Sequence, residues 1–147
     1  MSWKLIFALS MLGLAMAFAT VSFIPSRAEP LVWLAILIVC AFFIARLRPD
    51  RAFLHGLVLG LVNSIWVTGA HIMFFQQYIA NHPQEAAMTK SMPLPNSPRL
   101  MMALVGPPIG IVSGAVIGLS AMAINSLRRR FRRDPTIARR EHERNSE

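Results

Sequence analysis

The sequence predicts an all-α fold, a polytopic transmembrane bundle of four helices, from three observations. Hydrophobic residues make up 54% of the 147 residues and charged residues only 15%, a balance that is unusual for a soluble protein. Four long apolar runs come close to or exceed the roughly 20 helical residues that cross a hydrocarbon core of about 30 Å. Most of the prolines fall at or beyond the ends of these runs, where helices typically end.

The first span is expected at about residues 4–26, because no charged residue lies between Lys4 and Arg27. A cleaved secretory signal peptide is the alternative, since Lys4 precedes the apolar stretch and Ala17–Ala19 resembles a small-x-small cleavage site. The apolar run continues beyond that site and is longer than the usual signal core of about 7–15 residues. We therefore expect the first run to be retained as a helix.

The second span is expected at about residues 29–47. Its charge-free run is the shortest of the four, but Pro30 suits the first turn of a helix. At the other end, Arg46 can extend its guanidinium to the lipid headgroups. We therefore expect a short helix that still crosses the membrane.

The third span is expected at about residues 52–79, because its run contains no Asp, Glu, Lys or Arg before Glu85. One helix should cross the membrane, project beyond it near Tyr78 and end at His82 and Pro83. The following segment, 81–99, is rich in proline and has little hydrophobic periodicity. It is expected to be an extended extracytoplasmic loop with no core of its own.

The fourth span is expected at about residues 100–127. Pro107 and Pro108 interrupt it, and an internal proline removes a helical hydrogen bond, so the regular helix should begin at these prolines. Residues 1–127 would then form one four-helix transmembrane domain, and residues 128–147 a cytoplasmic polybasic tail.

The distribution of basic residues predicts the orientation, because short loops rich in Lys and Arg stay in the cytoplasm. Lys4, the arginines of segment 46–51 and those of the tail fall on one side of a four-span chain, and only Arg27, Lys90 and Arg99 fall on the other. We therefore expect an integral protein of the cytoplasmic (plasma or inner) membrane with both termini in the cytoplasm.

Two stripes of small residues predict close packing of the third and fourth spans. In lipid, helices associate where small side chains let their backbones approach, and a spacing of four places residues on one helix face. Consecutive spans are antiparallel neighbours, so these stripes should face each other; homo-oligomerisation through the glycine face is the alternative. The predicted packing residues are Gly56, Gly60, Ser64 and Thr68 in the third run and Gly106, Gly110, Gly114 and Gly118 in the fourth.

The polar residues at membrane depth are neutral or weakly basic. No Asp, Glu, Lys or Arg lies within the core of a predicted span, which argues against an exporter that relies on an intramembrane carboxylate. Ser64, Thr68 and His71 share one face of the third run. A small outward-facing pocket is expected near the outer ends of the third and fourth spans, unless His71 acts only as a headgroup anchor. The candidate pocket residues are His71, Gln76, Tyr78, Pro107 and Pro108.

No catalytic residue, cofactor site or metal site is expected from the sequence. Cys40 is the only cysteine, so one chain can form neither a disulfide nor a thiolate cluster. His55 and His71 lie too far apart on one helix to bind the same ion, and no nucleotide-binding loop or zinc-protease motif is present.

An arginine cluster follows the last span. Arginines beside an apolar run favour anionic phospholipid headgroups, with Phe131 inserted at the interface; a simple topology signal is the alternative. Nucleic acid is not expected as a partner. The candidate lipid-binding residues are Arg128, Arg129, Arg130, Arg132 and Arg133.

Taken together, these features predict a non-enzymatic packing, assembly or partner-binding subunit whose partners are the bilayer and a larger membrane protein. The alternative is a homo-oligomeric small transporter or channel that uses the polar strip of Ser64, Thr68 and His71. An intramembrane enzyme is disfavoured, because no paired catalytic groups occur.

Overall fold

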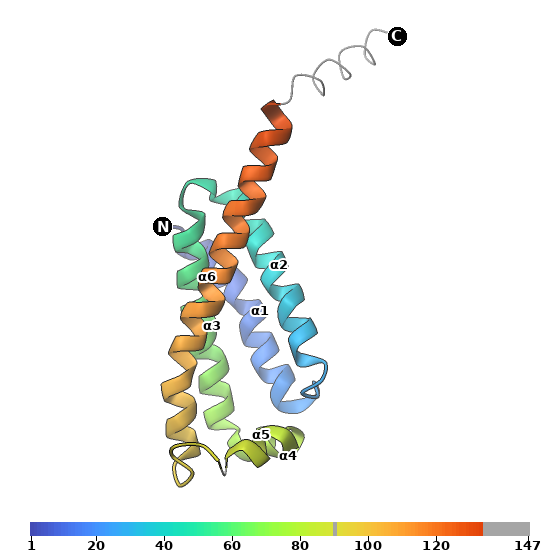
Figure 1. Cartoon of the computed structure of the whole chain (residues 1–147), viewed down its shortest axis with the longest axis vertical. Helices are drawn as coiled ribbons and strands as arrows, with labels where there is room; N and C mark the ends of the chain where they lie inside the picture. The colour runs from blue at the N-terminus through green and yellow to red at the C-terminus, as the bar shows by residue number, and fades with distance from the viewer. Residues whose placement is uncertain (90, 134–147) are drawn as a thin grey trace.

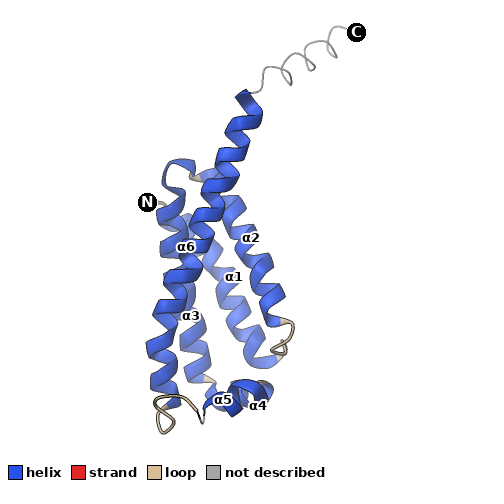
Figure 2. Ribbon diagram, viewed as in Figure 1, coloured by secondary structure: helices blue, strands red, loops and turns tan. Residues whose placement is uncertain are grey.

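The structure, a computed structural model, describes residues 1–89 and 91–133, which form helices joined by short turns (Figure 1; Figure 2). Four of the helices are long and apolar enough to cross a membrane, which confirms that part of the sequence prediction. No strand occurs in these two ranges. The elements are α1 (Trp3–Ser22), α2 (Glu29–Leu47), the 3₁₀ turn η1 (Pro49–Arg51), α3 (Ala52–Met73), α4 (Phe75–Asn81), α5 (Pro83–Thr89) and α6 (Pro98–Arg133).

The first two long helices differ in how well their expected ends agree with the structure. α1 ends at Ser22 rather than near residue 26, because the N–H groups of Phe23 and Ile24 both donate to the Ala19 carbonyl and Pro25 follows. α2 occupies the expected range 29–47, with Pro30 in its first turn.

The expectation of one continuous helix over residues 52–79 is wrong. α3 ends at Met73, and Phe74 leaves the helical conformation with φ −104° and ψ 33°. α4 then turns across the end of the bundle instead of projecting beyond it (Figure 1). The bend brings Tyr78 into the interior, where it is 8% exposed, and lets Asn81 Nδ2 donate to the Val21 carbonyl of α1 at 2.6 Å. Burial of Tyr78 and this hydrogen bond are the physical reason for the break.

The expectation of an extended loop over residues 81–99 is also wrong for most of that segment. His82 is fully buried, α5 begins at Pro83, and α6 already begins at Pro98. Proline is tolerated at the first position of a helix, where its missing N–H has no partner to lose. Only His82 and residues 91–97 remain irregular in the described part of the segment.

α6 is not interrupted at Pro107 and Pro108, contrary to the sequence expectation, and stays helical from Pro98 to Arg133. Both prolines are exposed, whereas Gly106 and Gly110 are buried on another face. Proline is tolerated within a membrane helix when neighbouring helices hold the turn in place. Contact between α3 and the glycine face of α6 supplies that support.

The core lies where all four long helices meet. Leu59 of α3, which is fully buried, belongs to one apolar cluster with Ile6 of α1, Ile44 of α2 and Ile117 of α6. The N-terminus, the α2–α3 turn and the C-terminal half of α6 lie at one end of the bundle, and α4 and α5 lie at the other (Figure 1).

The N-terminal segment is attached to the start of α3 through His55, which is 1% exposed. Its Nδ1 lies 2.8 Å from the Arg51 carbonyl, so Nδ1 must donate. Its Nε2 accepts the backbone N–H of Ser2 at 3.1 Å. These two bonds together require the neutral imidazole protonated at Nδ1.

Candidate functional site

The two stripes of small residues lie against each other along α3 and α6. A Cβ added at Gly114 would lie 2.7 Å from the Leu57 carbonyl oxygen, and one added at Gly118 would lie 2.8 Å from the Phe53 carbonyl oxygen. At Gly110 and Gly106 an added Cβ would instead meet the side chains of Ser64 and Thr68. At Gly114 and Gly118 the backbones are therefore too close for any side chain larger than hydrogen.

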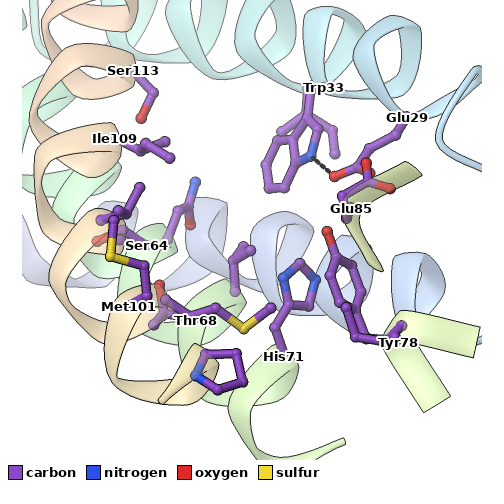
Figure 3. A pocket seen from close by; sticks show the side chains of 18 of the residues that line it. Glu29, Trp33, Ser64, Thr68, His71, Tyr78, Glu85, Met101, Ile109 and Ser113 are labelled. Atoms are coloured by element: carbon purple, nitrogen blue, oxygen red, sulfur yellow. Dashed lines mark hydrogen bonds between the residues drawn. The ribbon is translucent and has the colours of Figure 1, made fainter. Parts of the chain in front are cut away.

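A cavity of about 430 Å³ opens beside this contact, between α2, α3 and α6 (Figure 3). Trp33 and Leu37 of α2 line one wall, and Met101 and Ile109 of α6 line another. Val67 lies between them on α3. The lining is mainly apolar, which is typical of sites for small hydrophobic ligands.

The cavity includes some of the residues expected in a pocket and excludes others. His71 and Tyr78 line it. Gln76, Pro107 and Pro108 are exposed and do not line it, because α4 turns away from the axis of α3 and the prolines lie on the outer face of α6. Ser64 and Thr68 of the predicted packing stripe line it as well.

The lining residues that sequence reasoning missed include Glu29 and Trp33 of α2 and Glu85 of α5. One signal for the first two was available, since residues four apart on a helix are neighbours. The Trp33 indole N–H donates to Glu29 Oε1 at 3.2 Å (Figure 3). Glu85 could not be found in this way, because α5 was expected to be an extended loop.

Three stacked rings connect the cavity to the end of the bundle. The His71 and Tyr78 ring centroids are 4.0 Å apart, and those of Tyr78 and His82 are 4.3 Å apart. Thr20 donates its hydroxyl proton to the Ala17 carbonyl and also lies 3.0 Å from His71 Nε2. His71 Nε2–H is therefore the donor in the bond to Thr20.

Two carboxylates lie at the same side of the cavity, beside Trp33 and Tyr78 (Figure 3). Glu85 Oε2 accepts the Ser26 hydroxyl at 3.1 Å, which attaches α5 to the α1–α2 turn. Burial raises the pKa of the Tyr78 phenol, and the negative charges of Glu29 and Glu85 raise that pKa further. The phenol is therefore neutral at physiological pH.

The side chains of His82 and Glu29 face each other. His82 Nδ1 lies 3.0 Å from the Tyr78 carbonyl and must donate to it. His82 Nε2 lies 3.5 Å from Glu29 Oε2 and has no hydrogen-bond partner in the described residues. The two side chains form an ion pair only when His82 is protonated.

Asn63 is the polar residue deepest along the α3 wall. It is 7% exposed and lines the cavity, and its Oδ1 has no hydrogen-bond partner in the part of the chain that the structure describes. Gly13 of α1 provides the space for its amide. A buried amide oxygen without a donor is uncommon in proteins and points to a group that a ligand or water could satisfy.

The arginine cluster follows the bundle on α6. Arg128, Arg129 and Arg130 are exposed on the last turns of this helix. The helix continues through Arg132 and Arg133, whose side chains lie outside the described part of the structure, as do residues 134–147 of the expected tail.

The four apolar helices and the side cavity are features of an α-helical membrane protein. No group of three or more His, Cys, Asp or Glu side chains that could hold a metal ion occurs within residues 1–89 and 91–133. No protein-family model matches the chain, and no curated protein or solved structure is significantly similar to it.

Proposed function

We propose that this protein is a non-enzymatic binding protein of the cytoplasmic membrane, which holds a small apolar molecule in the cavity between α2, α3 and α6. The cavity itself carries the proposal. Its volume of about 430 Å³ falls within the range of about 300–1,000 Å³ that ligand sites occupy, and its mainly apolar lining with a few polar groups is typical of such sites.

The arrangement of α2 and α6 favours entry from the lipid. Ala41 and Ile44, in the C-terminal half of α2, share the core cluster with Ile117 of α6. The N-terminal half of α2 instead forms a cavity wall across from α6. A molecule dissolved in the bilayer could therefore enter sideways between these two helices, without crossing a polar surface.

The proposed orientation has both termini in the cytoplasm. Lys4, Arg48 and Arg51 share an end of the bundle with Arg128–Arg130, whereas Arg99 lies at the end formed by α4 and α5. The cavity then belongs to the outer half of the membrane. In this proposal α1 is a membrane helix that is not cleaved as a signal peptide, because Ile6 and Leu9 belong to the core cluster.

The contact between α3 and α6 is proposed as an intramolecular packing seam. α3 occupies the glycine face of α6, so that face is not free to pack against a second copy of the chain. The same contact disfavours the alternative homo-oligomeric channel built on the glycine face, because α3 of the same chain already covers that face.

The arginines beyond the bundle are proposed to contact anionic phospholipid headgroups. Each exposed arginine near an anionic leaflet contributes about 1 kcal/mol of attraction. Arg128–Arg130 are exposed on α6, which extends beyond the end of the bundle that holds the α2–α3 turn. Phe131, which is 67% exposed, can insert among the headgroups beside them.

Filling the cavity tests the proposed function. Ile109 lines the cavity, so Ile109→Trp should occupy part of its volume and prevent ligand retention. Native mass spectrometry of protein released from a mild detergent should detect a small bound molecule on the wild type and much less of it on the variant.

Ile111→Trp is the matched control. Ile111 lies on the same helix with 50% exposure, compared with 60% for Ile109, but it does not line the cavity. This variant should retain the small molecule. Equal retention by both variants, or a wild type without any bound molecule, would count against a ligand in the cavity.

A further inference from the structure

Asn63 places an amide in the wall of the cavity, near the middle of α3. The side chain is 7% exposed, and its Oδ1 is buried and accepts no hydrogen bond from the described residues. An unpaired polar group is costly in an apolar environment, and the core of a bilayer offers no water to pair with it. A ligand with a polar group at this depth would therefore be stabilised by the amide.

Gly13 of α1 leaves the space that this amide occupies. A Cβ added at Gly13 would lie 2.6 Å from Asn63 Cγ and 3.1 Å from Asn63 Nδ2, so a larger residue would displace the amide. Rotation of the amide by about 180° exchanges its oxygen and its nitrogen, so the cavity can meet either an acceptor or a donor. A hydroxyl group both donates and accepts, and it therefore pairs with the amide in either orientation.

Two serine hydroxyls also line the cavity, one on α3 and one on α6 (Figure 3). Ser64 Oγ donates to the Leu61 carbonyl at 2.9 Å, and Ser113 Oγ donates to the carbonyl one turn before it at 3.2 Å. Because each hydroxyl proton is used in a bond to the helix backbone, both oxygens remain as acceptors. The serines thus favour a ligand group that can donate a hydrogen bond.

The walls around these polar groups are apolar. Ile36 and Leu37 of α2 and Ile117 of α6 line the cavity, and Ile117 is only 1% exposed. In sites of this kind the apolar walls hold the body of the ligand, and a few polar groups fix its orientation. The lining therefore fits a molecule with a large apolar body and a small polar group.

We infer that the ligand is an apolar alcohol or phenol, whose hydroxyl group pairs with the Asn63 amide beside Ser64 and Ser113. This inference rests on the proposed function, since it names the chemical class of the molecule that the cavity holds. A lipid headgroup with hydroxyls, such as that of phosphatidylglycerol, would bring a charged phosphate towards the middle of the membrane, which is costly. The proposal therefore commits to a molecule without a phosphate.

Binding of alkyl probes to protein in phosphatidylcholine nanodiscs tests the inference. Tritiated dodecanol, 1-methoxydodecane and dodecane share one chain: the first donates and accepts hydrogen bonds, the second only accepts them, and the third does neither. Empty nanodiscs give the amount of each probe that dissolves in lipid, so that affinities are compared at equal concentrations in the bilayer. We expect dodecanol to bind about tenfold more tightly than either of the other probes.

The variant Asn63→Leu should weaken dodecanol binding by about tenfold. Leucine has the same branching as asparagine but no polar atom, so dodecane should bind the variant at least as tightly as the wild type, which would show that the cavity persists. Asn125→Leu is the matched control. Asn125 lies on α6 and does not line the cavity, and its Nδ2 is likewise buried without a partner in the described residues. This control should bind all three probes as the wild type does.

The possible outcomes separate the inference from the proposed function. Equal affinities of the wild type for dodecanol and 1-methoxydodecane would overturn the hydroxyl but keep an apolar ligand, and this comparison does not depend on the folding of a variant. An Asn63→Leu protein that binds dodecanol as tightly as the wild type would do the same. If no probe binds above the empty discs, both proposals fail. Displacement of dodecanol by phosphatidylglycerol added to the discs would assign the hydroxyl to a lipid headgroup and overturn the free alcohol.

Discussion

Gly114→Leu is expected to prevent the bundle from folding correctly. A Cβ at this position would lie 2.7 Å from the Leu57 carbonyl oxygen and 2.9 Å from its Cα, and backbone atoms cannot move aside as the end of a flexible side chain can. Forcing α3 and α6 apart should cost more than about 3 kcal/mol, above the usual penalty for overpacking. Size-exclusion chromatography and thermal unfolding in detergent would measure the loss of monodisperse, folded protein.

Gly69→Leu is the matched control for this prediction. Gly69 lies on α3, and a Cβ added there would meet nothing within 4 Å. Because leucine favours a helix over glycine by up to about 1 kcal/mol, this variant should be as stable as the wild type or more so. A folded Gly114→Leu protein that has lost only an oligomeric state would contradict the intramolecular seam and support assembly through the glycine face.

Leu59→Ala is expected to produce the second large effect. Leu59 is fully buried at the place where α1, α2, α3 and α6 meet. Removing a buried leucine typically costs about 2–5 kcal/mol. A value near the lower limit is expected here, because in lipid the transfer from water contributes little and the lost packing remains. The midpoint of thermal unfolding in detergent should fall accordingly.

Ile65→Ala provides the comparison on the same helix. Ile65 is 68% exposed and would face lipid, so its truncation should change the unfolding midpoint little. If the two variants had equal effects, the core at Leu59 would not be the centre of packing that the contacts indicate.

The helices were predictable to the extent that hydrophobic length determines them. The range of α2 agrees with the expected 29–47, and four helices long and apolar enough to span a membrane occur. The break at Phe74 was not predictable in this way, because the apolar run continues through it. It depends on the burial of Tyr78 and His82, which is a tertiary effect that no local pattern reports.

The site was predictable only on the α3 side. His71 and Tyr78 were expected in a pocket because they lie near the end of the third run, and both line the cavity. Glu29 and Trp33 lie on the opposite wall, and a sequence pattern gives the faces of a helix but not the distant helix that each face meets. The sequence places Pro107 and Pro108 at a helix break beside the pocket, whereas α6 continues through both prolines.

Cysteine accessibility tests the central claim most directly, namely that the chain spans the cytoplasmic membrane four times with the cavity in its outer half. Cys40, the only cysteine, is buried and can be replaced by alanine. Single cysteines are then placed at Asp50 in the α2–α3 turn, at Asn96 in the segment before α6, and at Ile38, which is 59% exposed in the middle of α2. The reagent is a membrane-impermeant maleimide applied to spheroplasts of an expressing bacterium.

In intact spheroplasts, Asn96→Cys should be labelled and Asp50→Cys protected. Permeabilisation should expose Asp50→Cys, whereas Ile38→Cys should stay unlabelled in both conditions because lipid covers it. Labelling of Asp50→Cys in intact spheroplasts, or of Ile38→Cys in either condition, would contradict the proposed arrangement of the four helices in the membrane.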